Sequence, residues 1–236
     1  MLVRAYLPNF LTALFGGLFI AAGILTFGDS FIFDRLYIGV LIFALVVCRT
    51  NINVVSVVVI ILIQLALEHL AWMFLSENYF IKCLLYSAAF WAAYSYRYDW
   101  VIKTIVPITI LVSVSEVFWY VTDYPAPQIY WHIAIMISNL ITRYLLFSRV
   151  SFVEDYFPGK GESINLDWII YKLSALTIIV QALVVFEYLA RHILGFSSIL
   201  FIYYSYPYLI QGIGTIALWS TFNESYKQLL PRLLKA

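Results

Sequence analysis

The sequence predicts an all-α integral membrane protein with about eight transmembrane helices. Apolar stretches of membrane-spanning length follow one another from Pro8 to Thr221, and only short loops separate most of them. Hydrophobic residues make up 64% of the chain and charged residues 11%, which leaves too little polar surface to cover a water-soluble protein. The stretches are continuously apolar and do not alternate with polar residues, so the pattern excludes an outer-membrane β-barrel.

A helix needs about 20 mostly apolar residues to cross a bilayer, because each residue adds about 1.5 Å and the hydrocarbon layer is about 30 Å thick. The stretches that meet this requirement are residues 8–27, 31–48, 54–75, 79–96, 101–121, 128–148, 166–190 and 197–220. The first stretch follows Arg4 and shows no small-residue cleavage site before Asp29. We therefore expect it to be a retained helix and not a signal peptide.

Charged residues mark the boundaries of the first six stretches. In chain order they are Asp29, Arg49, Glu77, Arg97, Asp123 and Arg149. The seventh stretch follows the longest loop, residues 151–165, in which Pro158-Gly159-Lys160-Gly161 predicts a turn. The eighth stretch precedes a tail, residues 223–236, that mixes Leu with Lys and Arg, and we expect this tail to form a short interfacial helix. A single polytopic membrane domain over residues 1–236 is expected.

The charges between the stretches sort by side of the membrane. One side carries Arg4, Arg49, Arg97, Lys103, Arg149, Lys160, Lys227, Arg232 and Lys235. The other side carries Asp29, Glu77 and Asp123, with Arg191 as the exception. The positive-inside rule then places both termini in the cytoplasm, and the compact size with small loops favours the inner membrane of a bacterial cell.

Charged side chains within a bilayer cost about 3 kcal/mol or more each, so those inside the spans require partners or a function. With the topology above, most of them fall in the outer half of the membrane: Asp34, Arg35, Glu68, His69, Lys82, Glu116, His132 and Glu187. The inner half contains Lys103, Arg143, Asp167 and Lys172, most of which are expected to reach the headgroups by extending along the helix.

Gln64 and Glu68 are the best-placed polar pair, since they are four residues apart on one face of the third span. His69 lies about 100° around the helix from Glu68. A carboxyl at this depth is either neutral or held ionised by a neighbour such as His132, Lys82 or Arg35. Both states suit a proton or cation pathway. The alternative is a structural hydrogen bond or ion pair that fixes the register of the helices.

Two further glutamates have functional and structural interpretations. Glu116 follows Ser113 and Ser115, and the three can line a polar strip on the fifth span; alternatively, the serines bond back to carbonyls of their own helix and Glu116 reaches the surface. Glu187 precedes Arg191 by four residues, which favours a local salt bridge over a role in transport.

The sequence implies no cofactor. His69, His132 and His192 are on different spans and belong to no metal-binding motif, although two of them can in principle hold a haem or a metal. Cys48 and Cys83 are expected at different depths, too far apart for a disulfide. The net charge is +1 with no basic run, which excludes nucleic-acid binding.

The leading functional hypothesis is a channel or transporter for protons or small cations. Glu68 and Glu116 would exchange protons or ions, and Gln64, Ser113 and tyrosines would line the route. A second hypothesis is a non-catalytic membrane subunit that anchors or regulates a partner protein through the tail or the 151–165 loop. A third is a membrane-embedded enzyme, or a metal or haem protein, with an outer Glu/His site. Besides the lipid bilayer, a partner protein or a homo-oligomer is possible, and no GxxxG motif marks a dimer face.

Overall fold

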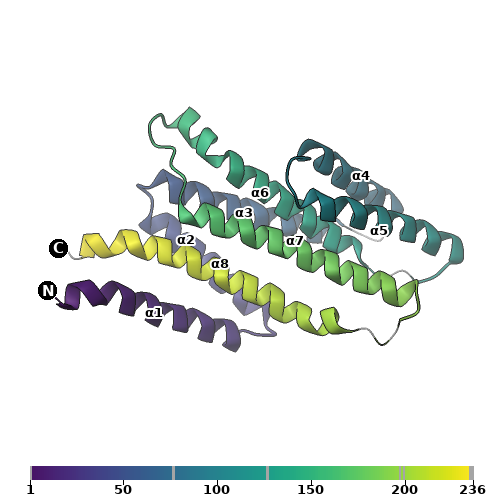
Figure 1. Cartoon of the computed structure of the whole chain (residues 1–236), viewed down its shortest axis with the longest axis horizontal. Coiled ribbons are helices and arrows are strands. Elements are labelled where there is room, and N and C mark those ends of the chain that lie inside the picture. The colour runs from purple at the N-terminus through teal and green to yellow at the C-terminus, as the bar shows by residue number, and fades with distance from the viewer. Residues whose placement is uncertain (1, 76–77, 126–127, 197, 199, 234–236) are drawn as a thin grey trace. The chain divides into compact units, whose positions relative to one another are not determined.

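The structure of the chain is a computed structural model that describes residues 2–75, 78–125, 128–196, 198 and 200–233. Within these residues the chain forms eight helices and no strand (Figure 1). The helices are α1 (Leu2–Leu25), α2 (Ser30–Val47), α3 (Ile52–Phe74), α4 (Tyr79–Ser95), α5 (Ile102–Thr122), α6 (Tyr130–Tyr156), α7 (Asn165–His192) and α8 (Phe201–Leu233). The predicted all-α class is thereby confirmed.

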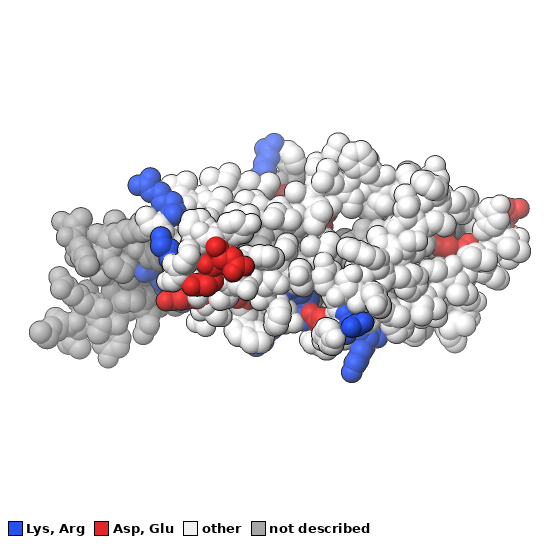
Figure 2. All heavy atoms as spheres, turned by 90° about the horizontal axis from the view of Figure 1, so that it is seen from above, with Lys and Arg blue, Asp and Glu red and all other residues white. Residues whose placement is uncertain are grey.

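Four of the described helices, α3, α5, α6 and α7, are long and apolar enough to cross a membrane. The described apolar part of α1, Thr12–Leu25, is shorter. The molecular face drawn in Figure 2 is nearly uncharged apart from a few separate groups of acidic and basic side chains, as expected of a surface in contact with lipid. The chain is therefore a helical membrane protein. That all eight helices cross the bilayer, and that both termini are cytoplasmic, stays a prediction.

Each predicted stretch corresponds to one helix, although several ends differ: α1 begins at Leu2, six residues before the predicted start, and α8 begins at Phe201, four residues after it. Helix α6 continues to Tyr156, so residues 151–156 of the predicted loop are helical, and α8 continues through the tail to Leu233. The prediction that the loop begins at residue 151 was wrong because hydropathy marks the lipid-facing part of a helix, whereas the helix itself ends where its hydrogen bonds end.

Some of the predicted topology signals fall on residues whose structure is not described. Glu77 and Lys235 lie outside the described residues, and the side chains of Arg4 and Arg232 are likewise not described. The positive-inside pattern therefore stays an argument from sequence at these positions.

The chain divides into two compact units. Unit 1 comprises Met1–Val59, Arg149–Ile170 and Tyr208–Ala236, and unit 2 comprises Ile60–Ser148 and Tyr171–Pro207. Helices α3, α6, α7 and α8 each contribute a segment to both units. The predicted single membrane domain is not tested by this division and stays a prediction.

In unit 1, α1 packs against α8 through aromatic rings and one close backbone approach (Figure 1). The ring centroids of Phe15 and Phe222 are 5.0 Å apart. A Cβ atom on Gly23 would lie 2.7 Å from Thr215 Oγ1, so the glycine is what lets the two helices approach. Gln211 Nε2 donates to the carbonyl of Gly23 at the same place. Unit 1 therefore has its own packed interior.

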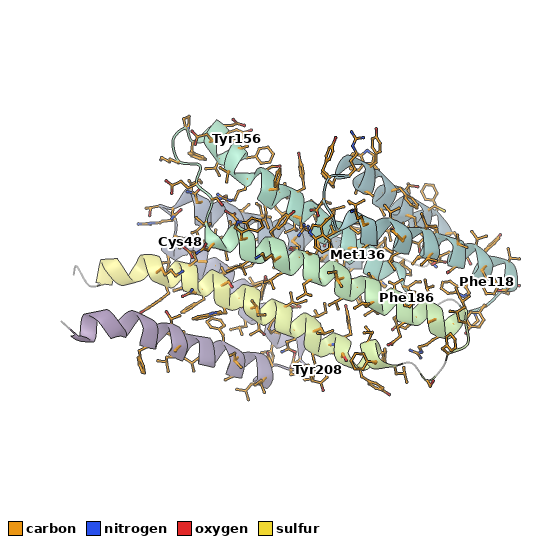
Figure 3. The ribbon with its side chains drawn as sticks, in the orientation of Figure 1. Cys48, Phe118, Met136, Tyr156, Phe186 and Tyr208 are labelled. Atoms are coloured by element: carbon orange, nitrogen blue, oxygen red, sulfur yellow. The ribbon has the colours of Figure 1, made fainter. Side chains whose placement is uncertain are left out.

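In unit 2, the core is formed by apolar side chains from α4, α5, α6 and α7. Met136, labelled in Figure 3, is fully buried there together with Ile133 and Ile178. Helices α4 and α5 run antiparallel and pack against each other as a hairpin joined by residues 96–101 (Figure 1). This core holds the polar side chains described next.

Candidate functional site

Helix α6 carries a stripe of polar side chains through unit 2. His132, Asn139 and Arg143 are separated by seven and four residues. At 3.6 residues per turn these three positions fall within about 20° of the helix face defined by His132. Ser138 lies beside Asn139, and both are buried, with relative exposures of 5% and 1%. Polar side chains of the neighbouring helices form hydrogen bonds or ion pairs with this stripe.

Glu68 on α3 accepts hydrogen bonds from neutral donors on α3 and α6. Its Oε1 atom lies 3.0 Å from Gln64 Nε2, 2.9 Å from Ser138 Oγ and 3.4 Å from Asn139 Nδ2. The second N–H of Gln64 reaches Asn139 Oδ1 at 3.3 Å. The predicted contact between Gln64 and Glu68 is confirmed. His69 is exposed on another face of α3.

A second network begins at His132. The Nδ1 atom of its ring lies within hydrogen-bonding distance of Gln181 Oε1 on α7. An amide oxygen only accepts, so in this arrangement the Nδ1 atom carries the proton and the Nε2 atom of a neutral ring is the acceptor. Gln181 Nε2 also donates to the hydroxyl of Tyr206 on α8 at 3.1 Å. Tyr206 is in turn close enough to Glu68 for an electrostatic interaction.

At the other end of the stripe, Arg143 forms a buried ion pair with Asp99 in the turn between α4 and α5. Its Nε and Nη2 atoms donate to the two carboxylate oxygens at 2.8 and 2.7 Å, and its Nη1 atom donates to the carbonyl of Tyr171 at 2.6 Å. The arginine side chain is 1% exposed. We expected most of the inner-half charges to reach the headgroups; Arg143 instead stays buried, because a partner within unit 2 neutralises its charge in place.

Glu116 and Lys82 form a third polar group, between α4 and α5. Lys82 Nζ lies 2.9 Å from Glu116 Oε2, and the Tyr86 hydroxyl donates to Glu116 Oε1 at 3.0 Å. Ser113 and Ser115 donate to carbonyls of their own helix, those of Thr109 and Leu111, at 2.8 and 2.7 Å. The carboxylate of Glu116 thus points to α4 and not to the surface.

The pair of Lys82 and Glu116 lines a groove of about 520 Å³. Tyr79 and Tyr120 lie at this groove, with ring centroids 5.1 Å apart in an edge-to-face arrangement. The groove is open on one side, and its wall is largely apolar. It is separate from the donors that surround Glu68.

The remaining predicted residues have local roles. Asp34 and Arg35 are exposed on α2 in unit 1, and the Arg35 guanidinium lies 3.8 Å from the centre of the Phe31 ring. Glu187 accepts hydrogen bonds from the backbone N–H groups of Ile202 and Tyr203 at 2.6 and 3.0 Å. It therefore caps the first turn of α8, and among the described residues it forms no ion pair with Arg191.

The histidines and cysteines do not come together in the described part of the chain. No group of three or more His, Cys, Asp or Glu side chains there has the arrangement of a metal site. His192 interacts with the hydroxyl of Tyr124 at 3.1 Å. Cys48 is buried, Cys83 is exposed, and both are free thiols.

Unit 1 contains a second buried arginine that the sequence did not single out as a site. Arg149 is paired with Asp167 and donates to Asn53 Oδ1 at 3.0 Å and to the carbonyl of Glu162 at 2.6 Å. Asp167 belongs to the inner-half charges, most of which we expected to reach the headgroups, and like Arg143 it is held by a partner instead. One sequence feature could have indicated this ion pair. Arg149 and Asp167 flank one loop on the same predicted side of the membrane and carry opposite charges.

Sequence reasoning also missed Ser138, Asn139 and Gln181, which are polar residues within otherwise apolar spans. No protein-family model matches the chain, and no curated protein or solved structure matches it. The chemistry of the residues just described is therefore the basis for assigning a function.

Proposed function

We propose that this chain is a multi-pass inner-membrane protein that moves protons across the membrane, with Glu68 as the carboxyl group that takes up and releases them. Both termini lie in the cytoplasm in this proposal, and all eight helices cross the bilayer. Glu68 is retained as an exchanging group from the sequence analysis, whereas Glu116 is assigned to the ion pair with Lys82 because that contact holds its charge in place.

The environment of Glu68 is the observation that carries the proposal. Glu68 lies on α3, the most apolar of the four candidate spans, six residues before the helix ends at Phe74. At about 1.5 Å per residue this is about 9 Å along the axis. The N–H and O–H donors on Oε1 stabilise a carboxylate. These contacts hold the carboxyl group in one position within an apolar span, where an ionisable side chain is a candidate proton carrier.

The His132 network supplies a path for the proton. An imidazole that donates through Nδ1 and accepts through Nε2 can pass a proton from one side of its ring to the other. Gln181 and the hydroxyl of Tyr206 continue the chain of hydrogen-bonding groups from the ring toward Glu68. The amide of Gln181 does not take up or release protons, so it orients the His132 ring and the Tyr206 hydroxyl, and these two groups are the ones that exchange protons with Glu68 in this proposal.

The ion pair of Arg143 and Asp99 closes the other end of the stripe. Arg143 follows Asn139 by one helical turn, about 6 Å along the axis, and in this proposal its side chain and that of Asp99, joined by two hydrogen bonds, block this end of the path. Release on this side therefore requires that the pair move. This favours a gated transporter over an always open channel.

Proton flux into liposomes tests the proposal. Purified wild-type protein, Glu68→Gln and the matched control Glu224→Gln would be reconstituted at equal density, and acidification would be followed with an internal dye. Glu224 is on the C-terminal part of α8 and pairs with the exposed Lys227 at 3.4 Å, so the control makes the same chemical change outside the network. We expect Glu68→Gln to reduce flux to that of protein-free liposomes and Glu224→Gln to leave it unchanged. Equal flux in all three proteins would overturn the assignment of Glu68.

One observation supports the alternative of a partner-binding subunit. Residues 157–164, between α6 and α7, are held in one conformation by Asn53, Arg149 and Glu154, whose side chains bond the loop backbone. A fixed exposed loop suits recognition by another protein. If a partner protein co-purifies in stoichiometric amount and is lost when this loop is replaced, the subunit function is favoured. If the partner still co-purifies after residues 223–236 are deleted, it binds the loop and not the tail.

A further inference from the structure

The groove between α4 and α5 contains a charge arrangement that the proton pathway does not use. Lys82 and Glu116 are buried, with relative exposures of 7% and 8%, yet both line the groove. The pair carries one positive and one negative charge and is therefore neutral as a whole. A neutral pair of fixed charges beside an open apolar groove is complementary to a ligand that carries both charges itself.

Both charged groups keep unused hydrogen-bonding capacity. The Lys82 ammonium has three N–H bonds, one of which is directed to Glu116 Oε2. The ammonium also lies 5.5 Å from the centre of the Tyr79 ring and 5.2 Å from that of Tyr130. The Glu116 carboxylate has about four lone-pair positions and accepts from Lys82 and Tyr86. An anionic group can therefore contact Lys82 while a cationic group contacts Glu116.

The position of the pair near the ends of α4 and α5 suits contact with a lipid headgroup. Lys82 is three residues after the start of α4 at Tyr79, and Glu116 is six residues before the end of α5 at Thr122. These separations correspond to about 5 and 9 Å along the helix axes. The polar layer on each side of a bilayer is roughly 5–8 Å thick, so a lipid headgroup lies at this level when the helix ends are at the water boundary.

The rest of the groove suits an acyl chain. Its wall is largely apolar, with Phe90 and Val117 among the lining residues. The exposed residues Tyr79 and Tyr120 line the groove about one helical turn closer to the helix ends than the ion pair, where tyrosines commonly contact headgroups. The volume of about 520 Å³ is within the range of about 300–1,000 Å³ found for small-molecule sites.

We propose that this groove binds one zwitterionic phospholipid with a primary ammonium headgroup, of the phosphatidylethanolamine class, whose phosphate contacts Lys82 and whose ammonium contacts Glu116. An anionic lipid offers Lys82 the same phosphate but places an unbalanced negative charge beside Glu116. The ethanolamine headgroup replaces this repulsion with attraction, so the ion pair selects for the zwitterion.

Lipid retention tests the proposal. The full-length protein would be placed in bilayer discs of phosphatidylethanolamine and phosphatidylglycerol in equal parts, extracted in mild detergent, and analysed by native mass spectrometry. We expect one retained lipid per chain, with about ten-fold enrichment of phosphatidylethanolamine, since charge-assisted contacts in a buried site give selectivity of this order. Equal retention of both lipids, or enrichment of phosphatidylglycerol, would overturn the proposal.

Three variants distinguish this site from general lipid adhesion. Ser87 is exposed and lines the groove, so Ser87→Trp should fill the groove without touching the ion pair and abolish retention. Ser95→Trp, at the exposed end of the same helix and outside the groove, is the matched control and should retain the lipid.

Glu116→Gln should keep a bound lipid but lose the preference for the ethanolamine headgroup. If Ser87→Trp retains as much lipid as the control, the proposal is wrong. It is also wrong if the groove of the wild-type protein is covered by a second copy of the chain and holds no lipid.

Discussion

Arg149 and Asp167 form a two-point ion pair in unit 1, in which both N···O distances are 2.6 Å and the arginine side chain is 1% exposed. The same aspartate accepts from the backbone N–H of Ile164 at 2.9 Å, so it also holds the start of α7. The same arginine donates to the carbonyl of Glu162. One ion pair thus connects α6, the loop at 157–164 and the first turn of α7.

Removal of one charge from this pair should be strongly destabilising. Asp167→Asn leaves Arg149 buried without its carboxylate, and breaking a buried pair in this way costs about 3–5 kcal/mol. The free energy of unfolding would be measured in detergent by chemical denaturation. Glu224→Gln breaks an exposed pair and should cost about 0–1 kcal/mol. A loss for Asp167→Asn as small as that of the control would contradict the structural role of the pair.

Asn53 should protect the loop from proteolysis. Its Nδ2 atom donates to the carbonyl of Lys160 at 2.9 Å and its Oδ1 atom accepts from the N–H of Glu162 at 3.1 Å, so the peptide bond after Lys160 and the one that follows it each have one group held by Asn53. In Asn53→Ala, trypsin should cleave after Lys160 about ten-fold faster, because loss of these bonds makes local opening easier. Asn165→Ala, at the exposed first residue of α7, is the control and should leave the rate unchanged. An unchanged rate in Asn53→Ala would show that the loop is held by other contacts.

Gly161 is required by the close packing of the same loop. A Cβ atom at this position would lie 2.8 Å from the carbonyl oxygen of Val150 and 3.0 Å from Glu154 Oε2. Gly161→Ala should therefore lower the free energy of unfolding by about 1–3 kcal/mol. Gly212 lies within α8 with nothing within 4 Å of an added Cβ, so Gly212→Ala should stabilise the protein by about 0.5–1 kcal/mol. The two alanine variants should thus differ in sign in the same denaturation experiment, and a neutral Gly161→Ala would contradict the loop packing.

The sequence could predict contacts within one helix but not those between helices. Gln64 and Glu68 were paired correctly because helical geometry alone brings positions four residues apart together. Ser138 and Asn139 are some 70 residues from Glu68 along the chain, and no local rule joins them. The length of each apolar stretch likewise predicted where the helices lie. The extension of α6 to Tyr156 depends on backbone hydrogen bonds, which a hydropathy pattern does not reveal.

The buried ion pairs were misjudged for a related physical reason. Arg143 is long enough to extend along its helix to the headgroups, and from the sequence alone this is the cheaper arrangement. The competing arrangement depends on Asp99, which is 44 residues away and reaches the arginine only when the α4–α5 turn packs on α6. Tertiary packing therefore determines which of the two arrangements Arg143 adopts.

Neutralising the pair of Arg143 and Asp99 should increase proton flux, because the proposed function assigns this pair to the closed end of the pathway. The double variant Arg143→Met with Asp99→Asn removes both charges together, which avoids the penalty of one unpaired buried charge. The amide oxygen that replaces the carboxylate can still accept from the N–H of Val101, so the turn keeps this bond. Flux into liposomes would be compared with that of wild type and of Lys103→Met, which removes an exposed charge on α5. A folded double variant with unchanged flux would contradict the closing role of the pair.

The most direct test of the central claim is an infrared difference spectrum recorded during a pH step on the protein in lipid membranes. The account predicts a carbonyl-stretch band of a protonated carboxyl group that appears on acidification, is present in wild type and in Glu224→Gln, and is missing in Glu68→Gln. A spectrum of Glu68→Gln identical to that of wild type would show that Glu68 does not exchange protons, and would contradict the proposed mechanism.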